Sequence, residues 1–187
     1  MPARDVHWTD EDYVRLEEAS STRHEFVEGE IYAMAGARPA HNKIATNTIA
    51  ALAQLVRAGT RCQAFGSDQR IHVASTGLYT YADGGVACGK WEILPRDGMS
   101  LLNPGLLFEV LSPSTRDYDR GAKLAHYRQI ASLTHVLLID EPARVVEHHR
   151  RQGEDWSVVT ASEGFLDLQE LGGVLLLDDV YYLAERG

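Results

Sequence analysis

The sequence contains no long hydrophobic run, and its longest uninterrupted apolar stretches are about five or six residues. A membrane-spanning helix needs about 20 consecutive apolar residues, so we expect no membrane segment. Residues 1–13 are largely polar and contain no apolar core of the kind found in secretory leaders. We therefore expect a cytoplasmic location.

Cysteine is almost absent, with Cys62 and Cys88 as the two in the chain. They can form at most one bridge, and disulfides are rare in a reducing compartment. The histidines at 135, 148 and 149 lack the spacing and the cysteine partners of a zinc site. We therefore expect two free thiols that serve as small core side chains.

Positive charge is also scarce, because 18 Lys and Arg residues stand against 27 Asp and Glu residues, a net charge of −9. Broad non-specific binding of nucleic acid needs Lys and Arg to neutralise phosphates. The charge therefore argues against that kind of binding. It leaves room for a local metal site that attracts phosphate.

Several enzyme signatures are missing as well. The sequence has no Gly-x-Ser-x-Gly elbow, no P-loop and no dinucleotide fingerprint. These absences give no support to a serine α/β-hydrolase, a P-loop nucleotidase or a dinucleotide-binding enzyme.

The patterning that is present predicts a globular α/β or α+β domain over residues 1–187. Its 44% hydrophobic and 24% charged content is typical of folded domains. The mixture of helical and strand periods favours a mixed sheet flanked by helices. The expected elements are a short helix after Thr9, a hairpin over 23–34, a helix over 39–58, strands at 62–65, 69–73, 78–88 and 106–111, a helix over 115–131, and strands at 135–140, 144–149 and 156–160.

Glu109 is the most unusual residue in this pattern. It interrupts the strand 106–111, which is apolar on both faces and is therefore expected at the centre of the sheet. A carboxylate buried there is costly unless a cation or hydrogen-bond donors meet it. Asp83 is a single acid in the preceding predicted strand, and a second acid nearby suggests that the partner is a cation.

Two carboxylates on successive strands can share one hard cation such as Mg²⁺. The backbone carbonyl of Val110 is expected to point toward the same place. A cation held by Asp83 and Glu109 can polarise a phosphoryl oxygen and lower the pKa of a bound water. Lys123, on the following helix, would then orient that water or stabilise developing charge.

The same residues resemble a known family. The string from Glu109 to Thr115, followed by 119–123 and Tyr127 and preceded by Asp83, resembles the Uma-two type of restriction endonuclease domain in the PD-(D/E)XK nuclease superfamily. The segments 24–30, around His41 and 171–173 match it too. The resemblance covers the chain from about Thr9 to Leu183.

That resemblance implies a restriction-endonuclease-like mixed β-sheet flanked by helices. It implies Asp83 and Glu109 as ligands of Mg²⁺, with Mn²⁺ able to substitute, and hydrolysis of phosphodiester bonds, in DNA rather than RNA, by a homodimer. The superfamily's lysine falls at Leu111 here, and Lys123 takes its place. The proline expected before the first acid is Ala82, and Gly84-Gly85 follow that acid, which predicts a deformable or bulged strand.

Each candidate also has a plainer structural interpretation. Glu109 could pair with a structural arginine, Asp83 could be a turn residue, and Lys123 could be solvated. Four accessory candidates carry the same ambiguity. They are Glu25 (an exposed strand acid paired with Arg23), His41 (a helix cap or core histidine), Asp68 (a turn residue) and Tyr127 (a core aromatic).

Three functions remain open from the sequence. The first is a Mg²⁺-dependent endonuclease. The second is a catalytically impaired nuclease fold that binds nucleic acid or a protein, which the acidic charge, Gly84-Gly85 and the displaced lysine favour. The third is a metal hydrolase of a small phosphate ester.

Overall fold

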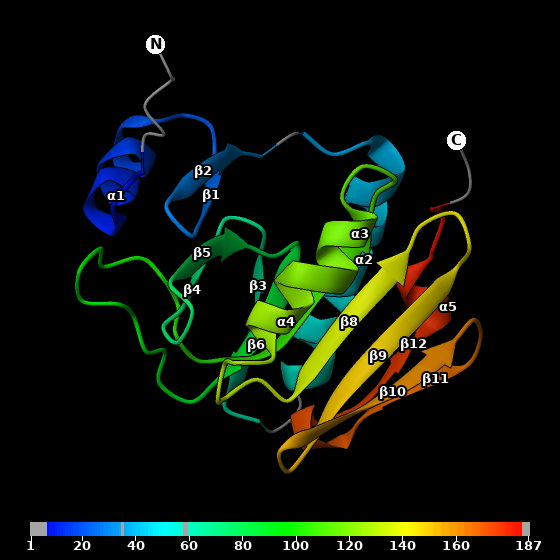
Figure 1. Ribbon diagram of the computed structural model, residues 1–187. Coiled ribbons are helices and arrows are strands. Elements are labelled where there is room, and N and C mark those ends of the chain that lie inside the picture. Colours follow the sequence, from blue (N-terminus) through cyan, green and yellow to red (C-terminus); the bar gives the residue numbers. More distant parts are fainter. Residues whose placement is uncertain (1–6, 35, 58–59, 185–187) are drawn as a thin grey trace.

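The computed structural model describes residues 7–34, 36–57 and 60–184 (Figure 1). Its helices are α1 (Asp10–Ala19), α2 (Pro39–Arg57), α3 (Arg116–Tyr118), α4 (Leu124–Tyr127) and α5 (Leu177–Val180), with a π-helical turn at Asp119–Lys123 and a 3-10 turn at Gln169–Leu171. Its strands are β1 (His24–Val27), β2 (Glu30–Ala33), β3 (Cys62–Gly66), β4 (Arg70–Val73), β5 (Leu78–Tyr81), β6 (Gly84–Cys88), β7 (Pro104–Leu111), β8 (His135–Asp140), β9 (Val145–Gln152), β10 (Asp155–Ala161), β11 (Phe165–Leu168) and β12 (Gly173–Leu176).

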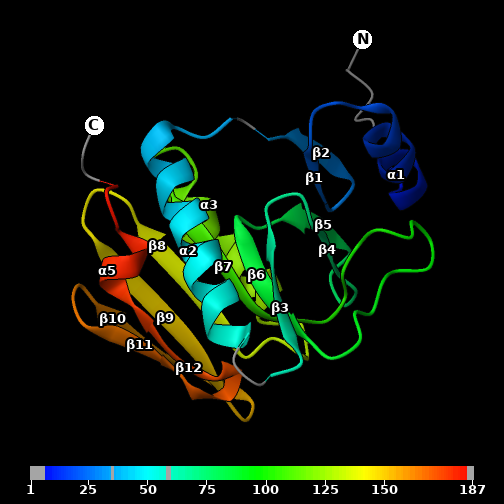
Figure 2. The same cartoon turned by 180° about the vertical axis from the view of Figure 1, so that it is seen from behind.

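Within the described residues, these strands form three sheets. The largest has six strands in the order β10-β9-β8-β7-β6-β3, the second has the order β2-β1-β5-β4, and β11 pairs with β12. Only β7 and β8 run parallel among the described strand pairs. The expected mixed α+β architecture, with helices flanking the sheet, is confirmed (Figures 1 and 2).

The strand β7 lies between β6 and β8, as its two-sided apolar sequence predicts. Leu106, Phe108 and Val110 face the layer formed by α2, α5 and β12, whereas Leu107 and Leu111 face the layer that contains α4. Figures 1 and 2, seen from opposite sides, show α3 and α4 on one face of the sheet and α2 crossing the other. Both faces of β7 are therefore covered, and Glu109 shares its face with Leu107 and Leu111.

The predicted hairpin and first two helices are present. Thr9 accepts from the main-chain N–H of Asp12 and completes a capping box at the start of α1. The turn between β1 and β2 places Glu28 at φ 52° and Gly29 at φ 83°, a two-residue geometry that suits the twist of paired strands. The helix α2 begins at Pro39 as expected, and the predicted end at Ala58 lies outside the described residues.

The single strand predicted over 78–88 is wrong. The chain leaves the four-stranded sheet after β5, passes through Ala82 and Asp83, and enters the six-stranded sheet as β6. A Cβ on Gly84 would lie 2.6 Å from the Phe108 ring and 2.8 Å from the Phe65 carbonyl. Gly84 therefore allows the neighbouring strands to pack closely. The bulge predicted at Gly84-Gly85 is not there, because the register of β6 against β7 shifts further on, between Val86 and Ala87.

The single helix predicted over 115–131 is also wrong in detail. It is divided into α3, a π-helical turn and α4, and α4 ends at Tyr127. The π turn buries both Asp119 and Lys123. Such turns are rare and often occur at functional sites.

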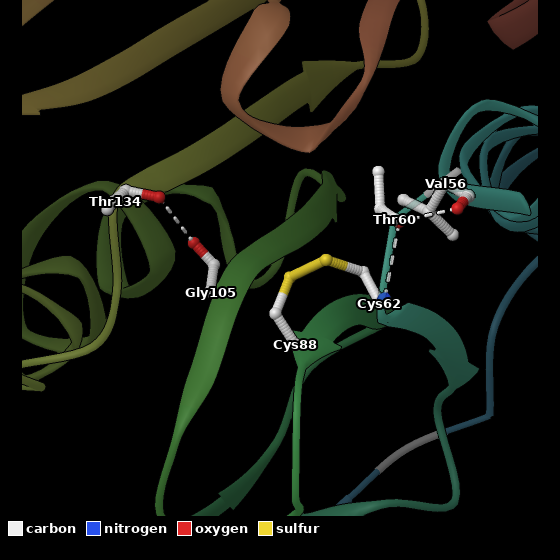
Figure 3. Close-up of a disulfide and its surroundings, with 6 residues drawn as sticks. All are labelled: Val56, Thr60, Cys62, Cys88, Gly105 and Thr134. Atoms are coloured by element: carbon white, nitrogen blue, oxygen red, sulfur yellow. Dashed lines mark hydrogen bonds between the residues drawn. A yellow bond between two sulfur atoms is a disulfide. The ribbon is translucent and has the colours of Figure 1, made fainter. Parts of the chain in front are cut away.

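The two cysteines are bonded, so the expectation of free thiols is wrong. Cys62 on β3 lies directly opposite Cys88 on β6 in an antiparallel pair, with 3.9 Å between their Cα atoms (Figure 3). This register brings the two side chains into bonding reach, whereas sequence alone does not reveal which strands pair. Thr60, also drawn in Figure 3, donates to the carbonyl of Val56 and accepts from the N–H of Cys62.

No helix among the described residues combines the length and the apolar content needed to cross a bilayer.

Candidate metal and catalytic site

The two principal acids lie where β6 and β7 come together. Glu109 on β7 is 5% exposed. Gly84 pairs with Phe108, so Asp83, one residue earlier, lies opposite Glu109. Asp83 is fixed there because its Oδ2 accepts the main-chain N–H of Val110 at 2.7 Å.

Lys123 reaches this point from the π turn. Its Nζ lies 3.1 Å from Oε1 of Glu109 and 2.8 Å from Oε1 of Glu25, and it donates to the carbonyl of Tyr81 at 3.1 Å. The side chain is 5% exposed. Lys123 is therefore neither solvated nor remote from Glu109, although it lies fourteen residues further along the chain.

The environment controls the protonation of this pair. Burial raises the pKa of Glu109 to about 8, Lys123 opposes the rise, and the charges of Asp83 and Asp119 add to it. Burial alone would lower the pKa of Lys123, but the surrounding negative charge, that of Glu109 first, raises it well above its ordinary value. The surrounding carboxylates therefore keep Lys123 charged beside Glu109.

His41, near the start of α2, is the second basic group at the site. Its Nε2 lies 3.0 Å from Oδ2 of Asp83. Burial would lower the pKa of His41, but the hydrogen bond and charge of Asp83 outweigh it and the pKa is raised. Asp83 is therefore held from two sides, by a main-chain donor and by an imidazole.

Of the other accessory candidates, the structure brings two to the site and leaves one out. Tyr127 donates its hydroxyl to Oε1 of Glu109 at 2.5 Å. Glu25 is 7% exposed, not an exposed strand acid, and accepts from the hydroxyl of Thr80 as well as from Lys123. Asp68 takes no part, because its side chain is 96% exposed and pairs with Arg23.

Two contributors escaped the sequence analysis. The carbonyl of Tyr81 is a backbone group with no sequence signal. Asp119 was not among the candidate residues, yet it is 5% exposed, and burial raises its pKa while Lys123 opposes the rise. Its spacing of four residues from Lys123 would have placed both on one helical face.

The arrangement has unused capacity for a cation. Glu25 and Glu109 pair with Lys123, Asp83 pairs with His41, and no described residue donates to Oδ1 of Asp83 or to Oε2 of Glu109. Over the described ranges, no three His, Cys, Asp or Glu side chains already form a metal cluster. A two-carboxylate site would therefore be completed by the Val110 carbonyl and water, which suits Mg²⁺.

The fold is a mixed sheet in which Asp83 precedes one strand, Glu109 lies within the next, and Lys123 contacts Glu109. This arrangement is that of a restriction-endonuclease-like nuclease fold. The comparisons agree with this class. Residues 10–176 match the model of the Uma2 family, described as "Putative restriction endonuclease", and the chain belongs to that family.

Its relatives carry little functional information by name. Two proteins of Synechocystis sp. are similar to it, "Uncharacterized protein sll1609" and "Uncharacterized protein slr1290". The first is 33% identical over 82% of this chain and 86% of its own length, and the second is 31% identical over 91% and 90%.

A solved structure shares the fold. It is the crystal structure of "a putative nuclease belonging to DUF820" from Anabaena variabilis, with a TM-score of 0.70 and 17% identity. The match covers 88% of this chain and 93% of that one.

Proposed function

We propose that this protein is a Mg²⁺-dependent endonuclease that hydrolyses phosphodiester bonds in DNA. The observation that carries the proposal is the contact of Lys123 Nζ with Glu109 Oε1 at 3.1 Å, beside a fixed Asp83. Family membership and the nuclease-like fold support the same reaction class.

The cation would be held by Asp83, Glu109 and the carbonyl of Val110. When bound, it would polarise a phosphoryl oxygen and lower the pKa of a coordinated water. His41 and the N–H of Val110 keep Asp83 in place. Tyr127 does the same for Glu109 through its hydroxyl.

Lys123 supplies the charged donor. An ammonium group has three N–H donors, and Tyr81, Glu25 and Glu109 occupy them. If Glu109 held a cation, the N–H group that now faces Glu109 would be available to hold a water or to stabilise charge on the phosphate. Glu25 is then a positioning residue, because it keeps the ammonium beside the reacting atoms.

The deciding experiment is cleavage of supercoiled plasmid with Mg²⁺ or Mn²⁺. We expect Glu109→Ala to reduce the rate at least about a hundredfold, whereas Glu92→Ala, which removes an exposed acid of the segment between β6 and β7, leaves it unchanged. Equal cleavage by the wild type and Glu109→Ala would mean that the activity lies elsewhere.

The alternative is a nuclease fold that binds nucleic acid without cutting it. The observation that favours it is Leu111, which is fully buried and offers no lysine at the superfamily position. A mobility-shift gel run beside the cleavage assay separates the two functions. A binding module would slow the migration of the plasmid without nicking it with either metal.

A further inference from the structure

The Cys62–Cys88 disulfide lies at an open edge of the six-stranded sheet. β3, which carries Cys62, is the last strand of that sheet, and no strand in the described part of the chain pairs with its outer edge. Cys88 is exposed at the end of β6, whereas Cys62 is half-buried against the core. A thiolate from solution can therefore reach this bond, which is the access that thiol–disulfide exchange requires.

The main chain holds the two cysteines opposite each other without the help of the bond. The N–H of Gly89 donates to the carbonyl of Arg61 at 2.7 Å. Hydrogen-bonded and non-hydrogen-bonded pairs alternate along an antiparallel ladder, so Cys62 and Cys88 form a non-hydrogen-bonded pair between two hydrogen-bonded ones. The hydroxyl of Thr60 also accepts the N–H of Cys62 at 3.2 Å (Figure 3). Two thiols would therefore stay in register and could form the bond again.

The bond closes a segment that carries part of the candidate site. The two cysteines are 26 residues apart in sequence. Between them lie three groups of the site, the Thr80 hydroxyl, the Tyr81 carbonyl and Asp83. Closing a loop removes conformational freedom from the residues within it. Opening the bond lets β3 separate from β6 more easily, and Gly66 on β3 pairs with Gly84, the residue after Asp83.

We propose that the Cys62–Cys88 bond is a reversible redox switch that controls the mobility of β3 and β6 and, through them, of the candidate site. The reductant is a dithiol, whose thiolate attacks Sγ of Cys88. A new S–S bond forms there, the Cys62–Cys88 bond breaks, and Sγ of Cys62 leaves with the electron pair and takes up a proton. The second thiol attacks the mixed disulfide and frees Cys88. The dithiol ends as a disulfide and has passed two electrons to the protein.

The first test is whether the folded chain passes between the two states. Incubation of the full chain with dithiothreitol, without denaturant, should make both cysteines react with iodoacetamide, as counted by mass spectrometry. Removing the dithiothreitol and adding oxidised glutathione should restore the bond before alkylation. Thiols that appear only in urea, or that do not pair again, would overturn the proposal.

Hydrogen exchange, followed by mass spectrometry, measures the change in mobility. In the reduced chain we expect the amides of β3, β6 and residues 80–83 to exchange at least about tenfold faster, and those of β8 and β9 to be unchanged. The melting midpoint should fall by about 5–10 °C. Equal exchange in the oxidised and reduced chains would overturn the proposal.

Two variants separate the bond from other effects of the reductant. The double variant Cys62→Ala/Cys88→Ala should exchange like the reduced wild type, with or without dithiothreitol. Gln63→Ala, at an exposed position on β3, keeps the bond and should respond to dithiothreitol as the wild type does. A double variant that still responds to dithiothreitol would contradict a switch at these cysteines.

Plasmid nicking links the switch to the site, and this arm rests on the proposed function. The reduced wild type and the double variant should nick at least about tenfold more slowly than the oxidised wild type, because small displacements of positioned groups are costly in rate. Equal nicking by the oxidised and reduced chains would refute control of the site. If neither form nicks, the proposed function fails, whereas the switch is still decided by alkylation and by exchange at residues 80–83.

Discussion

At the scale of single residues, the ammonium group of Lys123 contacts oxygen atoms from three strands. Glu25 and Tyr81 belong to the four-stranded sheet, whereas Glu109 belongs to the six-stranded one. The ammonium thus joins two sheets as well as serving the proposed chemistry. Removing one partner of a buried ion pair leaves the others uncompensated and costs about 3–5 kcal/mol.

Lys123→Met should therefore affect both stability and cleavage. It keeps the aliphatic stem but removes the charge, so we expect the free energy of unfolding to fall by about 3 kcal/mol and cleavage to fall at least about a hundredfold. Lys90→Met, at an exposed position, is the matched control. Urea unfolding and plasmid nicking measure the two effects, and an unchanged free energy of unfolding would contradict the buried pairing.

His148 makes a second prediction at this scale. Burial lowers its pKa to about 4, and the nearby charge of His135, whose Nδ1 lies 2.9 Å from His148 Nε2, adds to the lowering. Between about pH 6.5 and pH 4 the unfolded chain binds a proton there that the folded chain does not. Stability should therefore fall as the pH falls through this window.

The expected loss from His148 is about 3 kcal/mol, from about 1.4 kcal/mol per pKa unit. Urea unfolding at a series of pH values measures it. His148→Gln should flatten the profile between pH 6.5 and 4 relative to the wild type. Parallel profiles for the two proteins would show that His148 does not titrate as described.

At the scale of elements, the close packing of β6 between its neighbours sets the position of Asp83. Gly84→Ala should destabilise the fold by about 1–3 kcal/mol, because the added methyl group meets Phe108 and the carbonyl of Phe65. Gly121→Ala is the control, since nothing lies within 4 Å of its added Cβ. Thermal melting compares the two, and equal midpoints would mean that β6 has more room than the structure shows.

Local patterns predicted the elements that depend on local physics. The apolar run of β7, the turn at Glu28-Gly29 and the cap at Thr9 were all readable from the sequence. The passage from β5 to β6 was not, because sheet membership is decided by distant partners such as Phe108. The register that joins Cys62 to Cys88 was hidden for the same reason.

The candidate site was predictable in a different way. The chemistry of a buried acid predicted Glu109 and, with the acid of the preceding strand, Asp83, whereas resemblance to a family singled out Lys123. The roles of Glu25 and Asp119 required the structure, because a π turn and the meeting of two sheets bring them to Lys123. Backbone groups such as the Tyr81 carbonyl leave no trace in a sequence.

At the scale of the whole molecule, the net charge of −9 predicts that DNA binding depends on a divalent cation. The acids of the site would repel phosphate unless a cation lies between them. We expect fluorescence anisotropy to show DNA affinity falling more than tenfold when EDTA replaces Ca²⁺, used here to allow binding without turnover. The same affinity in both would contradict a cation-mediated contact.

The central claim is that Asp83 and Glu109 share one divalent cation beside Lys123. The most direct measurement is Mn²⁺ binding by isothermal titration calorimetry to the full chain, compared with Glu109→Gln and with Glu92→Gln as the control. We expect a Mn²⁺ site in the wild type and in Glu92→Gln, and an affinity at least tenfold weaker in Glu109→Gln. Unchanged Mn²⁺ binding in Glu109→Gln, with the fold intact, would contradict it.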